Sequence, residues 1–365
     1  MSLGYESNYI FRATELSKRN RVYTFDDVLL VPVRSAIMSR FHTDLTSQFT
    51  RRFKLKLPVV AANMDTVSEK EMCIAMNEIG AAAILHRFMD IPSQVQQLKA
   101  IRQAQEKTGG VLAASVGVSE DSKERARALV DGGAQILTVD IAHGHSESMI
   151  EMIRALKKEF PDVDVIGGNV ATPQATEDLI KAGADAIKVG IGPGSMCTTR
   201  VITGVGVPQL TAIAACAEIG RKHGVPIIAD GGIRASGDAF KALCVGASSI
   251  MMGSMLAGCL ETPGELVKGK KLYRGMASRS AQVSWRGGAL PEGMAPEGES
   301  HLVSCRGPVR ETVMELTGGI RSGMSYLNSQ KLGDLSEFAF FVEVSPNCQR
   351  ENLAHGLLLT DSSRN

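Results

Sequence analysis

A single cysteine in a glycine-rich segment is the strongest chemical signal in the sequence. Residues 190–200 read Gly-Ile-Gly-Pro-Gly-Ser-Met-Cys-Thr-Thr-Arg, which places Cys197 among glycines, hydroxyl side chains and an arginine. Glycine lets the backbone approach a ligand closely, and a thiol near backbone N–H groups and a cation loses its proton more readily. The thiolate is a nucleophile, so the segment is typical of a covalent catalyst. A structural loop that holds a small apolar cysteine is the alternative.

Eight apolar runs are the elements that must position this segment. They have the near-continuous apolar character of parallel strands that are covered on both faces. Their ranges are 57–64, 81–86, 111–116, 136–140, 163–170, 186–189, 226–230 and 249–252. Intervening stretches have helical periodicity; at 172–181, for example, Thr172 can cap a helix, Pro173 suits its first position and Gly183 follows its end.

Eight strand and helix units predict an α/β fold of the (β/α)8 TIM barrel type. We expect one catalytic domain over residues 1–365, with a barrel core at about 57–258, a mobile flap at about 266–300 and a C-terminal extension. An open doubly wound sheet is the alternative, but it usually has fewer strands. Residues before Arg21 and after Leu359 should be poorly ordered, and residues 338–344 resemble an extended segment that packs on a neighbouring subunit.

Polar side chains follow the runs at the end where a barrel places its active site. The seventh and eighth runs lead into residues 230–233 and 253–255, whose glycines leave backbone N–H groups accessible to a phosphate. Asp230 is a candidate acceptor for ribose hydroxyls. Further polar residues at strand ends are Asn63, Asp65, His86, Asp140, His143 and Asn169. Cys197 follows the sixth run, so we expect its thiol to face the same mouth.

Composition and charge exclude several classes of function. A net charge of +1 offers no basic surface for nucleic acid or for an anionic membrane. No apolar run reaches the roughly 18 residues of a spanning helix, and the N-terminus lacks a signal-peptide pattern. The seven cysteines are scattered and lack the spacing of zinc ligands. We therefore expect a cytoplasmic protein with free thiols.

The chain resembles the IMP dehydrogenase/GMP reductase family over nearly its whole length. Residues 188–200, which include Cys197, are the most specific match. Further matching phrases are Phe25-Asp-Asp-Val28, Asn63-Met-Asp-Thr-Val67, Thr203-Gly-Val-Gly-Val-Pro-Gln209, Ala229-Asp-Gly-Gly-Ile233, Met252-Gly-Ser254, Tyr273-Arg-Gly-Met276 and Pro296-Glu-Gly298. The resemblance implies an NAD- or NADP-dependent oxidoreductase, homotetrameric, that acts at C2 of a purine nucleoside monophosphate through a covalent bond to Cys197.

The resemblance also implies roles for individual residues. Cys197 would be the nucleophile, with Thr199 and Glu297 in proton transfer. The nucleotide would be held by Ser195, Asp230, Gly232, Gly253, Ser254, Tyr273, Gly275 and Met276. Asp140 and Asn169 would lie toward the nicotinamide. The backbone carbonyls of Gly192, Gly194 and Cys197 would correspond to the monovalent cation site of the family, which takes K⁺.

The flap favours the reductase reaction, in which GMP and NADPH give IMP, ammonia and NADP. Dehydrogenases usually insert CBS modules after the second strand, but here His86 leads directly into the next helix. They also carry an Arg-Tyr pair in the flap that activates the hydrolytic water, and residues 278–296 contain none. Such groups contribute typically about 10²–10⁴-fold to a rate. Arg279 or Arg286 could substitute.

Other features favour an IMP dehydrogenase without CBS modules, which converts IMP, NAD and water to XMP and NADH. Residues 229–237 and 261–265 read more like that enzyme. Arg87 stands where reductases carry a lysine for the ammonia-leaving step, and arginine cannot readily give up its proton. We favour GMP reductase. A purine nucleotide-binding protein without activity is a more distant alternative, because Cys197, Thr199 and Glu297 are all present.

Overall fold

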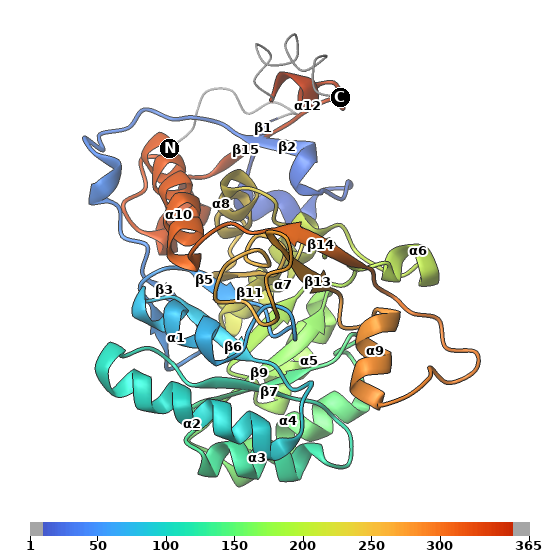
Figure 1. Cartoon of the computed structure of the whole chain (residues 1–365). Helices are drawn as coiled ribbons and strands as arrows, with labels where there is room; N and C mark the ends of the chain where they lie inside the picture. The colour runs from blue at the N-terminus through green and yellow to red at the C-terminus, as the bar shows by residue number, and fades with distance from the viewer. Residues whose placement is uncertain (1–9, 353–365) are drawn as a thin grey trace.

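The centre of the molecule is a closed barrel of eight parallel strands (Figure 1). The computed structural model describes residues 10–352. The barrel strands follow one another around the ring in chain order: β5 (Val59–Ala61), β6 (Ala82–Leu85), β7 (Ala113–Val116), β8 (Ile136–Asp140), β9 (Asp164–Val170), β10 (Ala186–Val189), β11 (Ile227–Asp230) and β12 (Ser249–Met252). Each lies within one of the eight predicted runs. The predicted (β/α)8 barrel is therefore confirmed, and the open sheet was the wrong alternative.

Eight helices cover the outside of the barrel. They are α1 (Lys70–Glu78), α2 (Ile91–Thr108), α3 (Ser122–Asp131), α4 (Glu147–Glu159), α5 (Pro173–Ala182), α7 (Gln209–His223), α8 (Ser236–Cys244) and α10 (Val309–Tyr326). Helix α10 contacts both α8 and α1 and so fills the eighth position. Helix α5 has the predicted ends: the Thr172 hydroxyl accepts the N–H of Ala175 at 3.2 Å, and Gly183 takes a left-handed conformation.

Side chains from alternate positions along the strands point inward and fill the barrel. Val60, Ile84, Ile136 and Ile228 are fully buried in one cluster there. Strands β3 (Ser47–Gln48) and β4 (Lys54–Leu55) form a hairpin that closes the amino-terminal end of the barrel. Phe49 and Leu55 of this hairpin belong to the same cluster. Each large apolar side chain buried in this way stabilises the fold by roughly 1.5–3 kcal/mol. The polar chemistry is therefore left to the carboxyl ends of the strands.

The two ends of the described chain meet in a small antiparallel sheet. Strand β15 (Phe340–Glu343) lies between β1 (Ile10–Arg12) and β2 (Val28–Leu30). The expected disorder before Arg21 is wrong for residues 10–20, because they form β1 and a 3₁₀ helix. Of residues 338–344, which were expected to be extended, Phe338 ends α11 and 340–343 form β15, which pairs within its own chain. The part of the chain after Leu359 lies outside the described residues. Further short helices of the described chain are η1 (Ala13–Lys18), η2 (Phe25–Asp27), η3 (Arg40–His42), η4 (Leu332–Asp334), α11 (Leu335–Phe338) and α12 (Cys348–Glu351).

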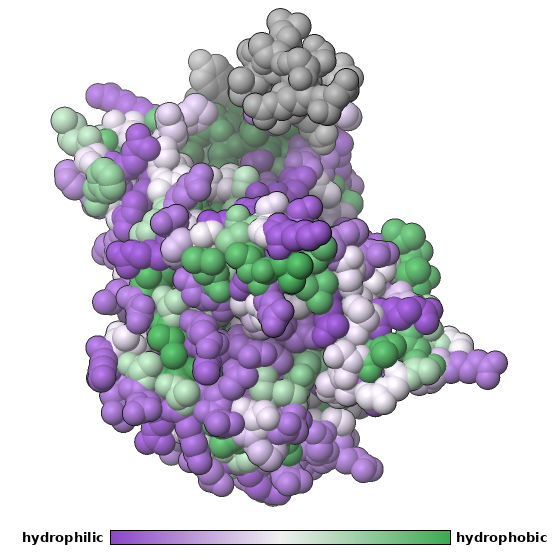
Figure 2. Space-filling view, in the orientation of Figure 1, coloured by the Kyte–Doolittle hydropathy of each residue, from purple (hydrophilic) through white to green (hydrophobic). Residues whose placement is uncertain are grey.

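The segment predicted as a flap leaves the barrel after β12 and forms a hairpin. Strands β13 (Lys270–Arg274) and β14 (Ser300–Ser304) pair antiparallel, and α9 (Arg279–Arg286) lies between them in sequence. Figure 1 shows α9 and the short helix α6 (Thr199–Thr203) beside the barrel mouth. Leu272 and Leu302 face each other across the hairpin and are exposed, and they belong to an apolar patch that Figure 2 shows over these strands.

Candidate active site

The Cys197 thiol begins a short relay of hydrogen bonds that ends on a carboxylate. Its Sγ donates to the Thr199 hydroxyl at 3.1 Å, and that hydroxyl donates to Glu297 Oε2 at 2.7 Å. The thiol proton therefore has a path through the hydroxyl to a base, which is the arrangement that activates a nucleophile. The structure thus brings together the three residues expected to act in catalysis, although Glu297 comes from the flap.

Backbone hydrogen bonds hold the two halves of this relay together. The N–H of Thr198 donates to the Glu297 carbonyl at 3.1 Å, and the N–H of Glu299 donates to the Met196 carbonyl at 2.9 Å. On the other side, the N–H of Glu297 donates to the Ala277 carbonyl at 3.0 Å. The cysteine loop and the end of the flap therefore form a strand-like unit, which fixes the carboxylate beside the thiol.

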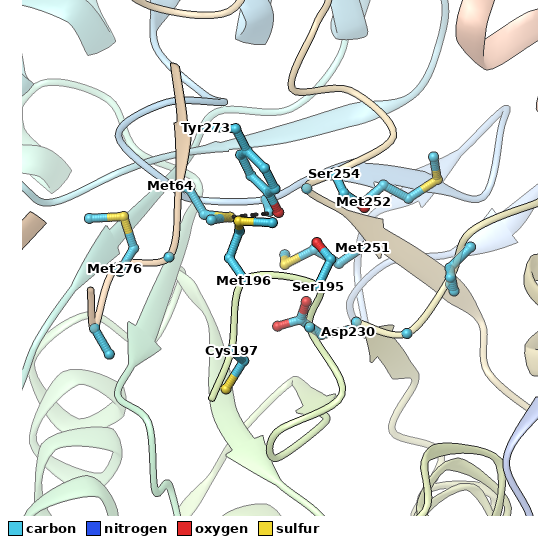
Figure 3. Close-up of a pocket in the computed structure, with 18 of the residues that line it drawn as sticks. Met64, Ser195, Met196, Cys197, Asp230, Met251, Met252, Ser254, Tyr273 and Met276 are labelled. Atoms are coloured by element: carbon cyan, nitrogen blue, oxygen red, sulfur yellow. Dashed lines mark hydrogen bonds between the residues drawn. The ribbon is translucent and has the colours of Figure 1, made fainter. Parts of the chain in front are cut away.

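A cavity of about 200 Å³ opens on one side of Cys197. Figure 3 shows Met64, Met196 and Met276 on one side of it, and Ser195, Ser254 and Asp230 on the other. All eight residues expected to hold the nucleotide line this cavity, namely Ser195, Asp230, Gly232, Gly253, Ser254, Tyr273, Gly275 and Met276. Flexible thioethers suit the face of a flat base, and hydroxyls with glycine N–H groups suit a phosphate.

Glycine is required at two close approaches near the site, at Gly190 beside Asp230 and at Gly253 in the wall of this cavity. A Cβ on Gly190 would lie 2.0 Å from the Asp230 carbonyl, and Gly190 has a φ of +152°. A Cβ on Gly253 would lie 2.7 Å from the Tyr273 hydroxyl. That hydroxyl is kept neutral, since burial raises the pKa of Tyr273 to about 12 against the opposing effect of Ser195. Tyr273 therefore offers the cavity a hydrogen-bond donor at neutral pH.

A second cavity of about 420 Å³ opens on the other side of the thiol. It is lined by Asp140 and Asn169, the residues expected on the nicotinamide side, and by Thr199. Cys197 and Asp230 line both cavities. The thiol thus stands between two compartments, where a molecule in one can reach an atom bonded to sulfur in the other.

A buried lysine organises the charges of the second cavity. The Lys188 ammonium lies 2.7 Å from Asp140 Oδ1 and 2.8 Å from Asp230 Oδ2. Burial alone would lower the pKa of Lys188, but the two carboxylates outweigh it and raise that pKa. Burial alone would likewise raise the pKa of Asp140, but Lys188 and then Arg87 hold it below its usual value. Asp140 is therefore kept as an anion beside the ammonium.

The flap helix α9 rests on the rim of the second cavity through aromatic contacts. The Trp285 ring meets Phe88 edge-on, with 6.0 Å between the ring centres. The Arg87 guanidinium lies 4.8 Å from the centre of Phe88 and 5.8 Å from that of Trp285. Arg286 donates to Gln282 at 3.0 Å, and, of the residues that the structure describes, neither Arg279 nor Arg286 lines the two cavities.

The carbonyls of Gly192, Gly194 and Cys197, which the resemblance assigns to a monovalent cation, belong to the loop after β10. The Gly194 carbonyl already accepts the N–H of Cys197 at 3.0 Å within the turn. Sites for K⁺ are rings of several backbone carbonyls, so the cation site in this loop stays a prediction. No group of three or more His, Cys, Asp or Glu side chains suited to a metal occurs among residues 10–352.

Sequence reasoning missed Lys188, and it missed the methionines Met64 and Met196. Lys188 had a usable signal: it is the one charged residue in the apolar run 186–189, and a lysine is almost never fully buried unless it is paired. The methionines carried no signal, because a methionine in an apolar run usually belongs to the core.

The remaining thiols differ from Cys197 in their surroundings. Cys73, Cys216, Cys244 and Cys259 are buried, and burial raises the pKa of each thiol. Cys197 is partly exposed in the wall of both cavities. In residues 10–352 no helix is long and apolar enough to cross a membrane.

Comparisons with known sequences agree with this site. A family model described as the IMP dehydrogenase / GMP reductase domain matches residues 22–355. The inosine-5'-monophosphate dehydrogenase of Cryptosporidium parvum is 40% identical over 381 residues, which cover 91% of this chain and 94% of that protein. That of Nitrosopumilus maritimus is 36% identical over 468 aligned residues, which cover 92% and 98%. The second alignment is longer than the 365 residues of this chain, so that relative contains residues that this chain lacks.

A solved structure is similar over almost the whole molecule. A GMP reductase from Trypanosoma brucei, in complex with guanosine 5'-monophosphate, superposes with a TM-score of 0.85 at 31% sequence identity. The match covers 94% of this chain and 99% of that chain. The similarity therefore includes both the barrel and the hairpin with its flap.

Proposed function

Because the chain belongs to the IMP dehydrogenase/GMP reductase family, whose members are NAD(P)-dependent oxidoreductases, we propose that it is a GMP reductase. The reaction takes GMP, NADPH and a proton to IMP, ammonia and NADP⁺. The nucleotide occupies the cavity lined by Ser195, Ser254 and Tyr273, and the dinucleotide occupies the cavity lined by Asp140 and Asn169.

The relay at Cys197 accounts for the first half of this reaction. The thiol proton passes through the Thr199 hydroxyl to Glu297, and the thiolate attacks C2 of the base. The protonated carboxyl of Glu297 then returns its proton to the amino group, which leaves as ammonia while the carbon–sulfur bond remains. A covalent intermediate of this kind divides one difficult displacement into two easier ones.

The second half of the reaction depends on the cavity beyond the thiol. The dinucleotide, when bound, supplies a hydride to C2, and the sulfur leaves as thiolate. The walls formed by Met276 and Ala277 and the flap helix α9 limit the access of water to C2. Exclusion of water matters for a reductase, because hydrolysis of the same intermediate would give XMP.

The observation that carries the choice of reductase is the composition of the flap. A dehydrogenase needs a base that activates water, and the segment from Ser278 to Pro296 has no Arg-Tyr pair. The three flap arginines, Arg274, Arg279 and Arg286, lie outside both cavities. Arg274 is paired with Asp65, and Arg286 is engaged with Gln282 and Trp285. The carboxylate of Glu297 is therefore placed for proton transfer, but no flap arginine is placed to activate water.

IMP dehydrogenase is the second candidate, because the relatives at 40% and 36% identity bear that name. Two assays on the purified protein separate the candidates. We expect loss of NADPH absorbance with GMP and formation of IMP and ammonia. Turnover of IMP and NAD to XMP, with GMP inert, would overturn the proposal in favour of the dehydrogenase. Binding of GMP without either turnover would indicate a nucleotide-binding protein.

We also propose that the protein is a homotetramer in solution. The apolar face of the hairpin, which includes Leu272 and Leu302, is the kind of exposed patch that subunit contacts cover. Size-exclusion chromatography with light scattering measures the mass directly. A monomeric mass at micromolar concentration would contradict the assembly.

A further inference from the structure

A charged layer lies above the apolar interior at the carboxyl ends of β8, β10 and β11. Lys188 shares the inner face of β10 with Ala186, which belongs to the barrel interior. Its side chain is 4% exposed, against 20% for Asp140 and 21% for Asp230. Gly168 on the adjoining β9 makes room for it, since a Cβ there would lie 2.6 Å from Lys188 Cβ. The fold therefore accommodates a full lysine at this position.

The contacts of Asp230 are asymmetric. Its Oδ2 accepts Lys188 Nζ at 2.8 Å and Asn169 Nδ2 at 2.9 Å. The Asn169 amide also donates to the Gly190 carbonyl at 2.7 Å, which fixes the amide in place. With Oδ2 engaged twice, Oδ1 is the oxygen that Asp230 can offer to hydroxyl groups in the nucleotide cavity.

The same ammonium holds the carboxylate on the other side of the thiol. Asp140 Oδ1 lies 2.7 Å from Lys188 Nζ, and Asp140 lines the second cavity but not the first. One cation therefore sets the orientation of Asp140, which lines the second cavity, and of Asp230, which lines both. Without it, two carboxylates would face each other with Arg87 as the remaining nearby cation, and mutual repulsion would move them apart.

We propose that Lys188 is a positioning residue that orients Asp230 toward the nucleotide and Asp140 toward the dinucleotide. Lys188 itself lines the second cavity, and its proposed role is to act through the two carboxylates. The inference rests on the proposed function for the assignment of the two cavities. Its consequence is a link between the compartments: a change at this one side chain alters the binding of both substrates.

The test is steady-state kinetics of Lys188→Met with GMP and NADPH varied in turn. We expect the KM of each to rise by about 10- to 100-fold, the value of one charge-assisted hydrogen bond to each substrate. The fall in kcat should be smaller, because the relay from Cys197 to Glu297 is intact. If Lys188→Met does not fold, Lys188→Gln keeps a polar group that reaches one carboxylate at a time, and the same rise in both values is expected.

Lys157→Met is the matched control. Lys157 on α4 is paired at 2.8 Å with Asp185, which directly precedes β10 and so lies at the end of that strand away from the site. Loss of this pair should lower the melting temperature without changing either KM. Unchanged KM values in a folded Lys188 variant, or a rise in only one of them, would overturn the inference. If the wild-type protein does not turn over GMP, the proposed function itself fails, which is a distinct result.

Discussion

At Cys197 the geometry separates two properties that a nucleophile needs, a path for its proton and access for its substrate. The path runs through Thr199 to Glu297, and the access comes from the two cavities that meet at the sulfur. Substitution of a residue in the proton path and substitution of a residue in a cavity wall should therefore change different kinetic parameters.

Cys197→Ser should abolish turnover and retain binding of the nucleotide. A serine hydroxyl has nearly the same shape but a far higher pKa than a thiol, so it does not provide the anionic nucleophile. Turnover is followed by NADPH absorbance, and binding by the rise in melting temperature with GMP. Residual turnover near the wild-type rate would exclude a covalent mechanism.

Glu297→Gln should lower kcat by about 10²–10⁴-fold, the usual contribution of a general acid–base group. The amide accepts a hydrogen bond from Thr199 but does not take its proton, so KM for GMP should change little. Glu299→Gln is the matched control, because that side chain lies two residues away and is exposed. A kcat within a few-fold of wild type in Glu297→Gln would contradict the relay.

At the scale of elements, the barrel was predictable and the terminal sheet was not. Each barrel strand is a nearly continuous apolar run beside a helical stretch, so local composition indicates it. Strand β15 instead pairs with β1, and Val342 lies opposite Ile10. That pairing joins segments more than 300 residues apart, and no local period records it.

The terminal sheet also contains a carboxyl group whose protonation at acidic pH should destabilise the fold. Glu343 on β15 accepts the Tyr23 hydroxyl at 2.5 Å and Arg19 at 3.0 Å, and the Tyr23 hydrogen bond, against a smaller effect of burial, lowers the pKa of Glu343. A carboxyl with a lowered folded-state pKa stabilises the fold above its unfolded pKa of about 4.3 and loses this contribution as the pH falls through the folded value. Glu343→Gln should therefore lower the stability by about 1–3 kcal/mol at neutral pH.

Melting curves of wild type and Glu343→Gln between neutral and acidic pH test this expectation. The difference between them should shrink as the pH falls below about 4, because the wild-type carboxyl is then protonated as well. Glu337→Gln on α11 controls for loss of a negative charge near the same sheet, since that side chain is exposed. A difference that stays constant with pH would show that Glu343 contributes by packing alone.

The contacts of the flap helix α9 predict an effect on the binding of the dinucleotide. Trp285→Ala removes the contacts with Phe88 and Arg87 that hold α9 at the rim of the second cavity. An aromatic pair is worth about 0.5–1.5 kcal/mol beyond its buried area, so KM for NADPH should rise a few-fold while KM for GMP stays near wild type. Val283→Ala on the same helix is the control. An unchanged KM for NADPH would mean that α9 is not a wall of that cavity.

At the scale of the whole molecule, the sequence located the site but not its charges. The residues expected to hold the nucleotide came from four separate segments, and all of them line one cavity. Barrel geometry made this predictable, since the ends of parallel strands converge. The pairing of Lys188 with Asp140 and Asp230 depends on which inward side chains meet across the barrel, and a linear pattern does not contain that information.

The burial of the thiols across the whole fold predicts a pattern of alkylation. Four cysteines are buried with raised pKa values, while Cys197, Cys305 and Cys348 are partly exposed. Because only the thiolate reacts, brief treatment of the native protein with iodoacetamide should modify these three and leave the other four. GMP should protect only Cys197 from alkylation, as measured by peptide mass spectrometry. The activity that remains in the NADPH assay should be proportional to the fraction of Cys197 that is unmodified. Alkylation of Cys197 that GMP does not slow would place the nucleotide outside the cavity beside the thiol.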